Sequence, residues 1–187
     1  AVRKAIRRFN IRHAITFHSS IAKAKAFTDN QPIFSDLFPQ YWKTDNFHVS
    51  GKMPTSVRAR HMEEFEASKR AIMTNARCLT EGVDVPDIDC VLFADPKKST
   101  IDIVQAVGRA LRLSEGKKLG YVIVPVIIED EGNFDKSDAF QTILMTLRAL
   151  ASNDERIIDY FRARSQNKRT YTNIQIEVDE RIAEKID

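Results

Sequence analysis

The sequence has few cysteines and no long apolar run. Cys78 and Cys90 are the two cysteines among 187 residues, and neither lies in a metal-ligand spacing. We therefore expect no metal site, and two reduced packing cysteines of a cytoplasmic protein. No apolar stretch reaches the roughly 18 residues of a membrane helix, and no signal peptide is recognisable, so no membrane association is expected.

Two motifs that handle nucleotide phosphates are also absent. No Gly-x-x-x-x-Gly-Lys-[Ser/Thr] loop occurs, because Met53 follows Gly51-Lys52 and Asn46 occupies the position of the first glycine. No Asp-Glu-x-x box follows a predicted strand. These absences exclude a complete phosphate cradle with its Mg²⁺ carboxylates from this chain.

The composition that is present is that of an ordinary globular chain with a mildly basic balance. Hydrophobic residues make up 43% and charged residues 29%, and the net charge is +3. This balance permits a nucleic-acid partner without demanding one. Residues 1–13 carry five cations and no acid, whereas 177–187 carry five acids. A solvated helix face or a linker is the favoured interpretation of the basic N-terminal run, ahead of a binding patch.

Short β-rich stretches alternate with helical patterns along the first two-thirds of the chain. Strands are predicted at residues 13–18, 46–50, 71–74, 90–94 and 120–128, and helices at 1–9, from 19–20 to about 28, from 54 onward and around 99–112. This alternation predicts an α/β fold with a parallel sheet flanked by helices. Residues 29–44 are interpreted as a packed irregular connection. Tyr41 and Trp42 are expected to be buried in it, with base stacking as the alternative.

The pattern changes beyond the acidic loop at residues 129–136. Apolar residues recur with helical spacing in 140–150, and Ser152-Asn-Asp-Glu155 has the form of a capping box. We therefore predict a sheet domain over residues 1–133 and a small, mostly helical C-terminal extension over 134–187.

The predicted helix around 99–112 has one polar and one apolar face. Gln105, Arg109 and Arg112 fall within roughly 60° of one another at about 100° per residue. Two guanidiniums one turn apart suit a multiply charged oxyanion such as a phosphate. Taken alone, a solvated helix face is the default interpretation of such a pattern.

Polar residues and glycines follow the predicted strands at corresponding places. They are Ser19, Ser20, Ser50, Gly51, Thr74 and Asn75, with Gly82 and Asp84 in the loop Thr80-Glu-Gly-Val-Asp-Val-Pro86. Because ligands of open parallel sheets bind beyond the carboxyl ends of the strands, these positions are the candidate site.

In these segments the sequence resembles a known family. Gln105-x-x-Gly108-Arg109-x-x-Arg112 is similar to motif VI of superfamily 2 DEAD/DEAH-like helicases and translocases, and Thr80–Pro86 is similar to motif V. Ile15–Ser20 resembles motif IV, and Ser50-Gly51, Arg58 and Phe65 follow the spacing between motifs IV and V. Residues 10–128 therefore resemble the second RecA-like domain of this family, closest to bacterial restriction- and repair-type motors.

The resemblance implies roles at an ATP site. Arg112 would be an arginine finger on the γ-phosphate, with Arg109 beside it and Gln105 orienting the network. Asp84 would meet the ribose or couple it to the arginines, and Gly82 would let the backbone approach. Mg²⁺ and most of the ATP contacts would belong to an N-terminal RecA-like domain expected before Ala1. The isolated chain is then expected to be inactive.

The resemblance also implies a track for a nucleic-acid strand, DNA more than RNA. Its residues would be Ser19, Ser20, Gly51, Arg58 and Thr74, mostly touching phosphates. Helix capping alone is an equal alternative for both serines, and a solvated or internally paired side chain is an equal alternative for Arg58. A non-catalytic binding module that keeps a degenerate motor fold is the alternative for the whole chain.

Overall fold

The computed structural model describes residues 2–76, 88–95 and 120–125, together with 141, 145–146, 148, 151–152, 163 and 166. The chain divides into two compact units, Ala1–Pro125 and Val126–Asp187. The predicted boundary after residue 133 and the helical character of the extension stay predictions. None of the helices in the described ranges has the length and hydropathy of a membrane-spanning segment.

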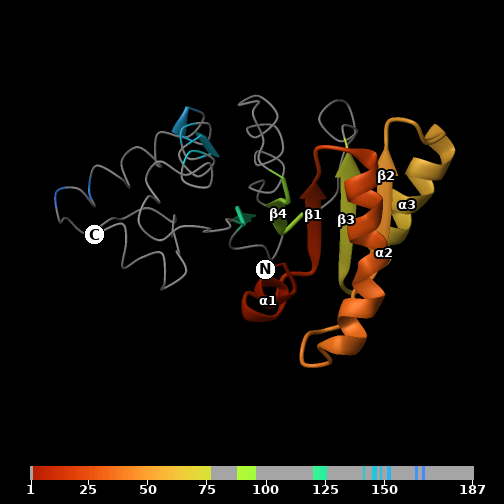
Figure 1. Ribbon diagram of the computed structural model, residues 1–187, viewed down its shortest axis with the longest axis horizontal. Helices are drawn as coiled ribbons and strands as arrows, with labels where there is room; N and C mark the ends of the chain where they lie inside the picture. The colour runs from red at the N-terminus through yellow and green to blue at the C-terminus, as the bar shows by residue number, and fades with distance from the viewer. Residues whose placement is uncertain are drawn as a thin grey trace. The chain divides into compact units, whose positions relative to one another are not determined.

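The first unit is built on a five-stranded parallel sheet, as predicted (Figure 1). The strands are β1 (His13–Phe17), β2 (Asp45–Ser50), β3 (Ala71–Ala76), β4 (Cys90–Phe93) and β5 (Tyr121–Ile123). Their order is β2-β3-β1-β4-β5, with every neighbouring pair parallel. β1, β3 and β4 are buried along their whole length because helices cover both faces of a parallel sheet, whereas β2, at the edge of the sheet, is buried only at Val49 and Ser50.

The last strand is shorter than the predicted segment 120–128. β5 ends at Ile123, and Val124 and Pro125 have no regular structure. Pro125 has no backbone N–H to donate to a neighbouring strand, which disfavours continued pairing there.

In the described part of the chain, three helices pack against the sheet: α1 (Val2–Arg8), α2 (Ile21–Leu37) and α3 (Thr55–Ala67). Phe65 of α3 packs on the rings of His13 and Phe47, on one face of the sheet. Thr28 of α2 reaches Thr74, whose neighbour His48 points to the face opposite Phe47. α2 and α3 therefore cover opposite faces, which gives three layers (Figure 1).

α2 runs well past the predicted end near Thr28, so the prediction of an irregular 29–44 connection is wrong for its first half. Pro32 lies inside the helix and supplies no N–H to the carbonyl one turn earlier. Side-chain bonds and burial offset this loss: Gln31 is 6% exposed, and Arg3 Nε donates to its Oε1 at 3.0 Å. The predicted burial of Trp42 is also wrong, since 40% of its surface is exposed.

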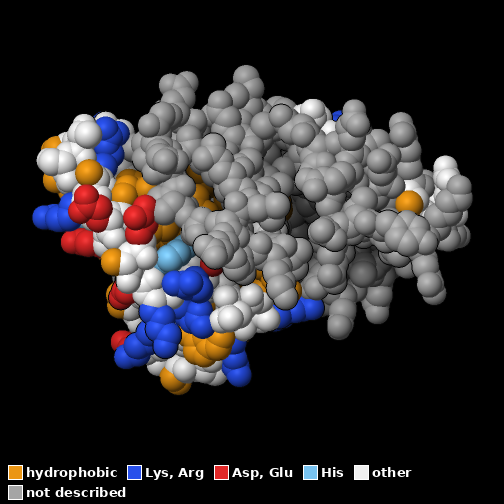
Figure 2. Space-filling model, turned by 180° about the vertical axis from the view of Figure 1, so that it is seen from behind, with side chains coloured by type: hydrophobic (Ala, Val, Ile, Leu, Met, Phe, Trp, Pro, Cys, Tyr) orange, Lys and Arg blue, Asp and Glu red, His pale blue; other side chains and the backbone are white. Residues whose placement is uncertain are grey.

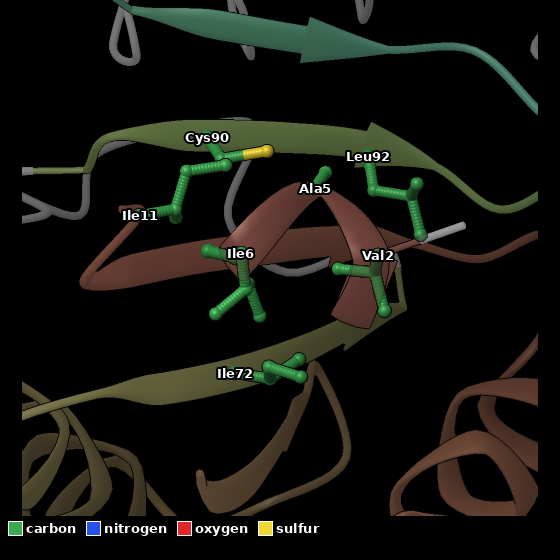
Figure 3. Packing of buried hydrophobic residues seen from close by; sticks show 8 residues of the cluster. Val2, Ala5, Ile6, Ile11, Ile72, Cys90 and Leu92 are labelled. Atoms are coloured by element: carbon green, nitrogen blue, oxygen red, sulfur yellow. The ribbon is translucent and has the colours of Figure 1, made fainter. Parts of the chain in front are cut away.

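The apolar face of α1 closes the core on the α2 side of the sheet. Val2, Ala5 and Ile6 recur at helical spacing and pack against Ile72 of β3 and against Cys90 and Leu92 of β4 (Figure 3). Burial raises the pKa of the Cys90 thiol well above its usual range. Cys90 is thus the reduced packing residue that the sequence predicts.

Candidate functional site

The carboxyl ends of the strands meet at one edge of the sheet. Beyond β1, the His18 N–H donates to the carbonyl of Asn75 in β3 at 3.0 Å. The N–H of Ala94, after β4, donates to the Phe17 carbonyl at 3.0 Å, and Ser50 pairs with Ala76. The segments that follow β1, β2 and β4 therefore leave the sheet at the edge where parallel sheets bind ligands.

Ser19 and Ser20 form the turn between β1 and α2. The Ser20 hydroxyl accepts from the Lys23 N–H at 3.2 Å with an extended backbone, so Ser20 is the N-cap of α2. Ser19 is exposed, and its N–H donates to Asp95 Oδ2 at 3.0 Å. The capping interpretation is thus confirmed for Ser20, while the nucleic-acid contacts of both serines stay predictions.

Asp95 is a member of this edge that the motif comparison missed. It lies two residues after the end of β4, and its Oδ1 accepts from Lys23 Nζ at 2.6 Å while Oδ2 accepts from the Ser19 N–H. Burial alone would raise the pKa of Asp95, but the hydrogen bonds from Lys23 and Ser19 outweigh it and hold the pKa below its usual value. Asp95 therefore joins the β1–α2 turn to the end of β4. The signal for it was its position immediately after a predicted strand.

His18 lies beneath this link, 4% exposed. Its Nε2 is 2.9 Å from Thr16 Oγ1, and its Nδ1 is 4.0 Å from Asp95 Oδ2. Burial lowers the pKa of His18 from 6.5 to about 4, because Asp95 only partly offsets the desolvation and Lys23 and His48 add to it. The imidazole is therefore neutral near pH 7.

Acidification from pH 7 to 4 is expected to cost the fold up to about 3 kcal/mol through His18, at about 1.4 kcal/mol per pKa unit. The unfolded chain protonates His18 near pH 6.5, whereas the folded chain protonates it only near pH 4. The stability that neutral His18 contributes is therefore fully present above about pH 6.5 and is lost as the pH falls from 6.5 to about 4. Urea unfolding at a series of pH values measures the slope. His18→Gln should flatten it, and an unchanged slope would contradict this account.

Thr74 is fully buried, inside β3 rather than after it. Its hydroxyl is 2.6 Å from Thr28 Oγ1 and 2.9 Å from His48 Nδ1. Burial, followed by the neighbouring His61, lowers the pKa of His48. The Thr74 side chain thus connects α2 to β2 and presents no surface to a ligand in this arrangement.

Gly51 and Arg58 follow β2. Gly51 is exposed in a turn that the Met53 N–H closes on the Ser50 carbonyl at 3.1 Å. Arg58 is half-buried on the first turns of α3, and its Nη2 donates to Thr55 Oγ1 at 3.2 Å. Both residues lie next in sequence to the carboxyl edge, which suits the phosphate contacts predicted for them.

The predicted ATP-site residues lie outside the described residues. These are Gly82, Asp84, Gln105, Arg109 and Arg112. Within the described ranges, no group of three or more His, Cys, Asp or Glu side chains is arranged to hold a metal ion.

A five-stranded parallel sheet with helices on both faces and polar turns at its carboxyl edge defines a RecA-like α/β domain. Residues 2–114 match the model of the helicase conserved C-terminal domain. The chain belongs to this family, as a superfamily 2 helicase C-terminal domain.

Relatives come from viruses and from eukaryotes. The chain is 33% identical over 109 residues to the probable helicase A859L of African swine fever virus (isolate Pig/Kenya/KEN-50/1950), covering 58% of this chain and 12% of that protein. It is 40% identical over 68 residues to the putative mitochondrial ATP-dependent helicase irc3 of Schizosaccharomyces pombe, covering 36% and 11%. The chain thus spans about an eighth of the length of these relatives.

Two solved structures share the fold. One is the ATP-dependent Type ISP restriction-modification enzyme LlaBIII bound to DNA, with a TM-score of 0.75 and 27% identity over 94% of this chain and 12% of that one. The other is Mss116p DEAD-box helicase domain 2 bound to an RNA duplex, with a TM-score of 0.51 and 16% identity over 99% and 85%. The predicted likeness to restriction-type motors is confirmed by the first of them.

Proposed function

We propose that this chain is the C-terminal motor domain of a nucleic-acid-dependent ATPase, acting with an N-terminal RecA-like domain of the same protein. The observation that carries the proposal is the family match over residues 2–114, which includes every predicted motif residue from Ser19 to Arg112. The sheet supports it, because its carboxyl edge gathers the segments that carry motif IV and the glycine turn after β2.

ATP would bind between the two domains as substrate. Arg109 and Arg112 would place guanidinium forks against its phosphates, and Gln105 would orient them; planar forks match phosphate oxygens in pairs. The charge that develops on the transferring phosphoryl group is stabilised by such arginines. Gly82 and Asp84 would lie against the sugar. Mg²⁺ would be held by carboxylates of the N-terminal domain, where it would supply charge neutralisation.

A nucleic-acid strand would cross the carboxyl edge. Ser19, Ser20 and the backbone of Gly51 offer hydroxyl and N–H donors to phosphates, and Arg58 adds a cation beside them. Thr74 acts by holding α2 against β2 rather than by touching the strand. DNA is the favoured substrate because the neighbour with the higher identity is a DNA-bound restriction-modification enzyme.

Asp95 would connect the two activities. Its carboxylate accepts hydrogen bonds from Ser19 and Lys23, beside the proposed nucleic-acid contacts. It also lies ten residues before Gln105 in the sequence. A displacement of the arginine segment on ATP hydrolysis would therefore reach the β1–α2 turn through one carboxylate. Repeated closing and reopening of the cleft would then step the strand.

The isolated 187-residue chain is expected to hydrolyse ATP no faster than a buffer blank, with or without nucleic acid. The reason is that the phosphate loop and Mg²⁺ carboxylates are absent from it. The measurement is phosphate release, with the longer protein that contains both domains as the positive control. Rapid ATP hydrolysis by the isolated chain would contradict the proposal that it contributes only half of the ATP site. Absence of turnover in the longer protein would favour a non-catalytic module.

A further inference from the structure

Trp42 is exposed at the amino edge of the sheet, opposite the carboxyl edge. It is the single tryptophan of the chain and lies in the segment 38–44, between α2 and the start of β2. Trp42 is 40% exposed. Burying an indole would stabilise the fold more than burying almost any other side chain, and this exposure gives up part of that contribution. The amino ends of the strands lie about 20 Å from the carboxyl edge, at roughly 3.3 Å per residue.

A buried arginine holds this exposed tryptophan in place. Arg3 is 2% exposed, and its Nη1 donates to the Trp42 carbonyl at 2.7 Å while its Nε donates to Gln31. Desolvation lowers the pKa of Arg3, so the fold bears the cost of a buried cation here. Arg7 Nη1 adds a bond to the Gln40 carbonyl at 3.0 Å. The 38–44 segment is thus fixed before any ligand binds, which lowers the entropy cost of binding.

Arg70 stacks on the indole. Its guanidinium carbon lies 4.0 Å from the ring centroid of Trp42, which is a cation–π contact. Arg70 is itself held by the Ile11 carbonyl at 3.2 Å and by Asn10 Oδ1 at 2.7 Å. Asn10 has φ of 53°, a left-handed conformation that asparagine tolerates better than most residues. The result is a flat, oriented pair of an indole and a guanidinium.

More cations lie next to the amino ends of the same sheet. Besides Arg70, the Lys and Arg residues next to the amino ends of β1, β2 and β3 or at the end of α1 are Arg7, Arg8, Arg12, Lys43 and Lys69. The carboxylates nearby are fewer, namely Asp36, Asp45, Glu66 and Asp89, and Asp89 Oδ2 already accepts the Arg12 and His13 N–H groups. Figure 2 shows Lys and Arg side chains gathered around hydrophobic ones at the lower end of the described part.

We propose that this amino-edge surface, formed by Trp42, Arg70, Arg7, Arg12 and Lys43, binds single-stranded nucleic acid. A base would stack on the Trp42–Arg70 pair, and the cations would meet the flanking phosphates. Aromatic stacking combined with a positive surface is how proteins bind single strands without reading sequence. An acidic peptide would satisfy the cations but would leave the flat aromatic pair without a matching partner. The surface adds a contact beyond the motif edge and does not depend on ATP hydrolysis.

The single tryptophan makes the test direct. Selective excitation of Trp42 in the 187-residue chain, titrated with short oligothymidylate, should give saturable quenching. An abasic oligonucleotide of equal length carries the same phosphates without bases, and it should give little quenching and weaker binding. In fluorescence anisotropy with a labelled oligothymidylate, Trp42→Leu should lower affinity roughly 5- to 100-fold. Arg12→Gln with Lys43→Gln, both exposed, should reduce the salt slope by about 1.4, at about 0.7 per phosphate contact on a single strand.

Arg60→Gln is the matched control, since Arg60 is an exposed cation on α3, away from this surface. It should leave the quenching of Trp42 unchanged. If Trp42→Leu does not fold, judged by circular dichroism, the Arg12→Gln/Lys43→Gln variant, which keeps Trp42, still tests whether this surface binds the strand. Absence of quenching at concentrations that saturate anisotropy would overturn the proposal. Equal quenching and equal affinity with the abasic strand would also overturn it. Displacement of the oligonucleotide and quenching of Trp42 by polyglutamate alone would overturn it as well, and would indicate an acidic protein partner.

Discussion

Replacing Arg112 with alanine in the full-length protein is expected to lower the maximal ATPase rate about 10³-fold. The proposed function places its guanidinium on the γ-phosphate, and removal of such a finger costs 10³–10⁵ in rate in other phosphoryl-transfer enzymes. Affinity for nucleic acid should change less than about threefold, because the strand contacts lie on other segments. Steady-state phosphate release and equilibrium binding to a labelled oligonucleotide measure the two effects separately.

Arg60→Ala is the control for lost charge. Arg60 is an exposed arginine whose Nε is 3.8 Å from Glu64 on the same helix, an arrangement worth little. Its ATPase rate should match the unmodified protein. Equal losses of ATPase and of nucleic-acid affinity in the Arg112 variant would contradict the finger role, and so would full activity.

Phe65→Ala is expected to lower the free energy of unfolding by about 3–5 kcal/mol, the usual cost of removing a buried phenyl ring. Phe65 is 0% exposed, and its ring packs on His13 of β1 and Phe47 of β2. It is the main ring that holds α3 to the sheet. Urea denaturation of the 187-residue chain, followed by circular dichroism, measures the shift.

Leu37→Ala is the matched deletion at the surface. Leu37 ends α2 with 68% of its surface exposed, so the change should stay within about 0.5 kcal/mol. A Phe65 variant that unfolds at the same urea concentration as the Leu37 variant would show that α3 contributes little to the core.

The sheet was predictable because its strands are short, apolar and separated by helical patterns. His13–Phe17 and Cys90–Phe93 fall almost where the alternation places them. The length of α2 was not predictable, because Pro32 locally favours a helix break. The hydrogen bonds that offset this preference come from Arg3 in another helix. Such contacts between distant segments leave no local pattern in the sequence.

The same difference between local and distant contacts explains which site residues could be predicted from the sequence. The Ser20 cap was readable because it depends on residues within one turn. Thr74 was predicted to follow a strand, but β3 extends to Ala76 and buries it under α2. Asp95 went unnoticed because its partners, Ser19 and Lys23, lie more than 70 positions earlier.

The central place of β1 in the sheet has a consequence for biosynthesis. Of the strands in this sheet β1 is made first, yet its neighbours are β3, which starts at Ala71, and β4, which starts at Cys90. At about 5–20 residues per second, a ribosome needs several seconds to deliver both partners. During that interval β1 carries two unpaired edges and an apolar surface, the features that chaperones recognise and that favour aggregation. Overproduction should therefore benefit from added chaperone before any change of sequence.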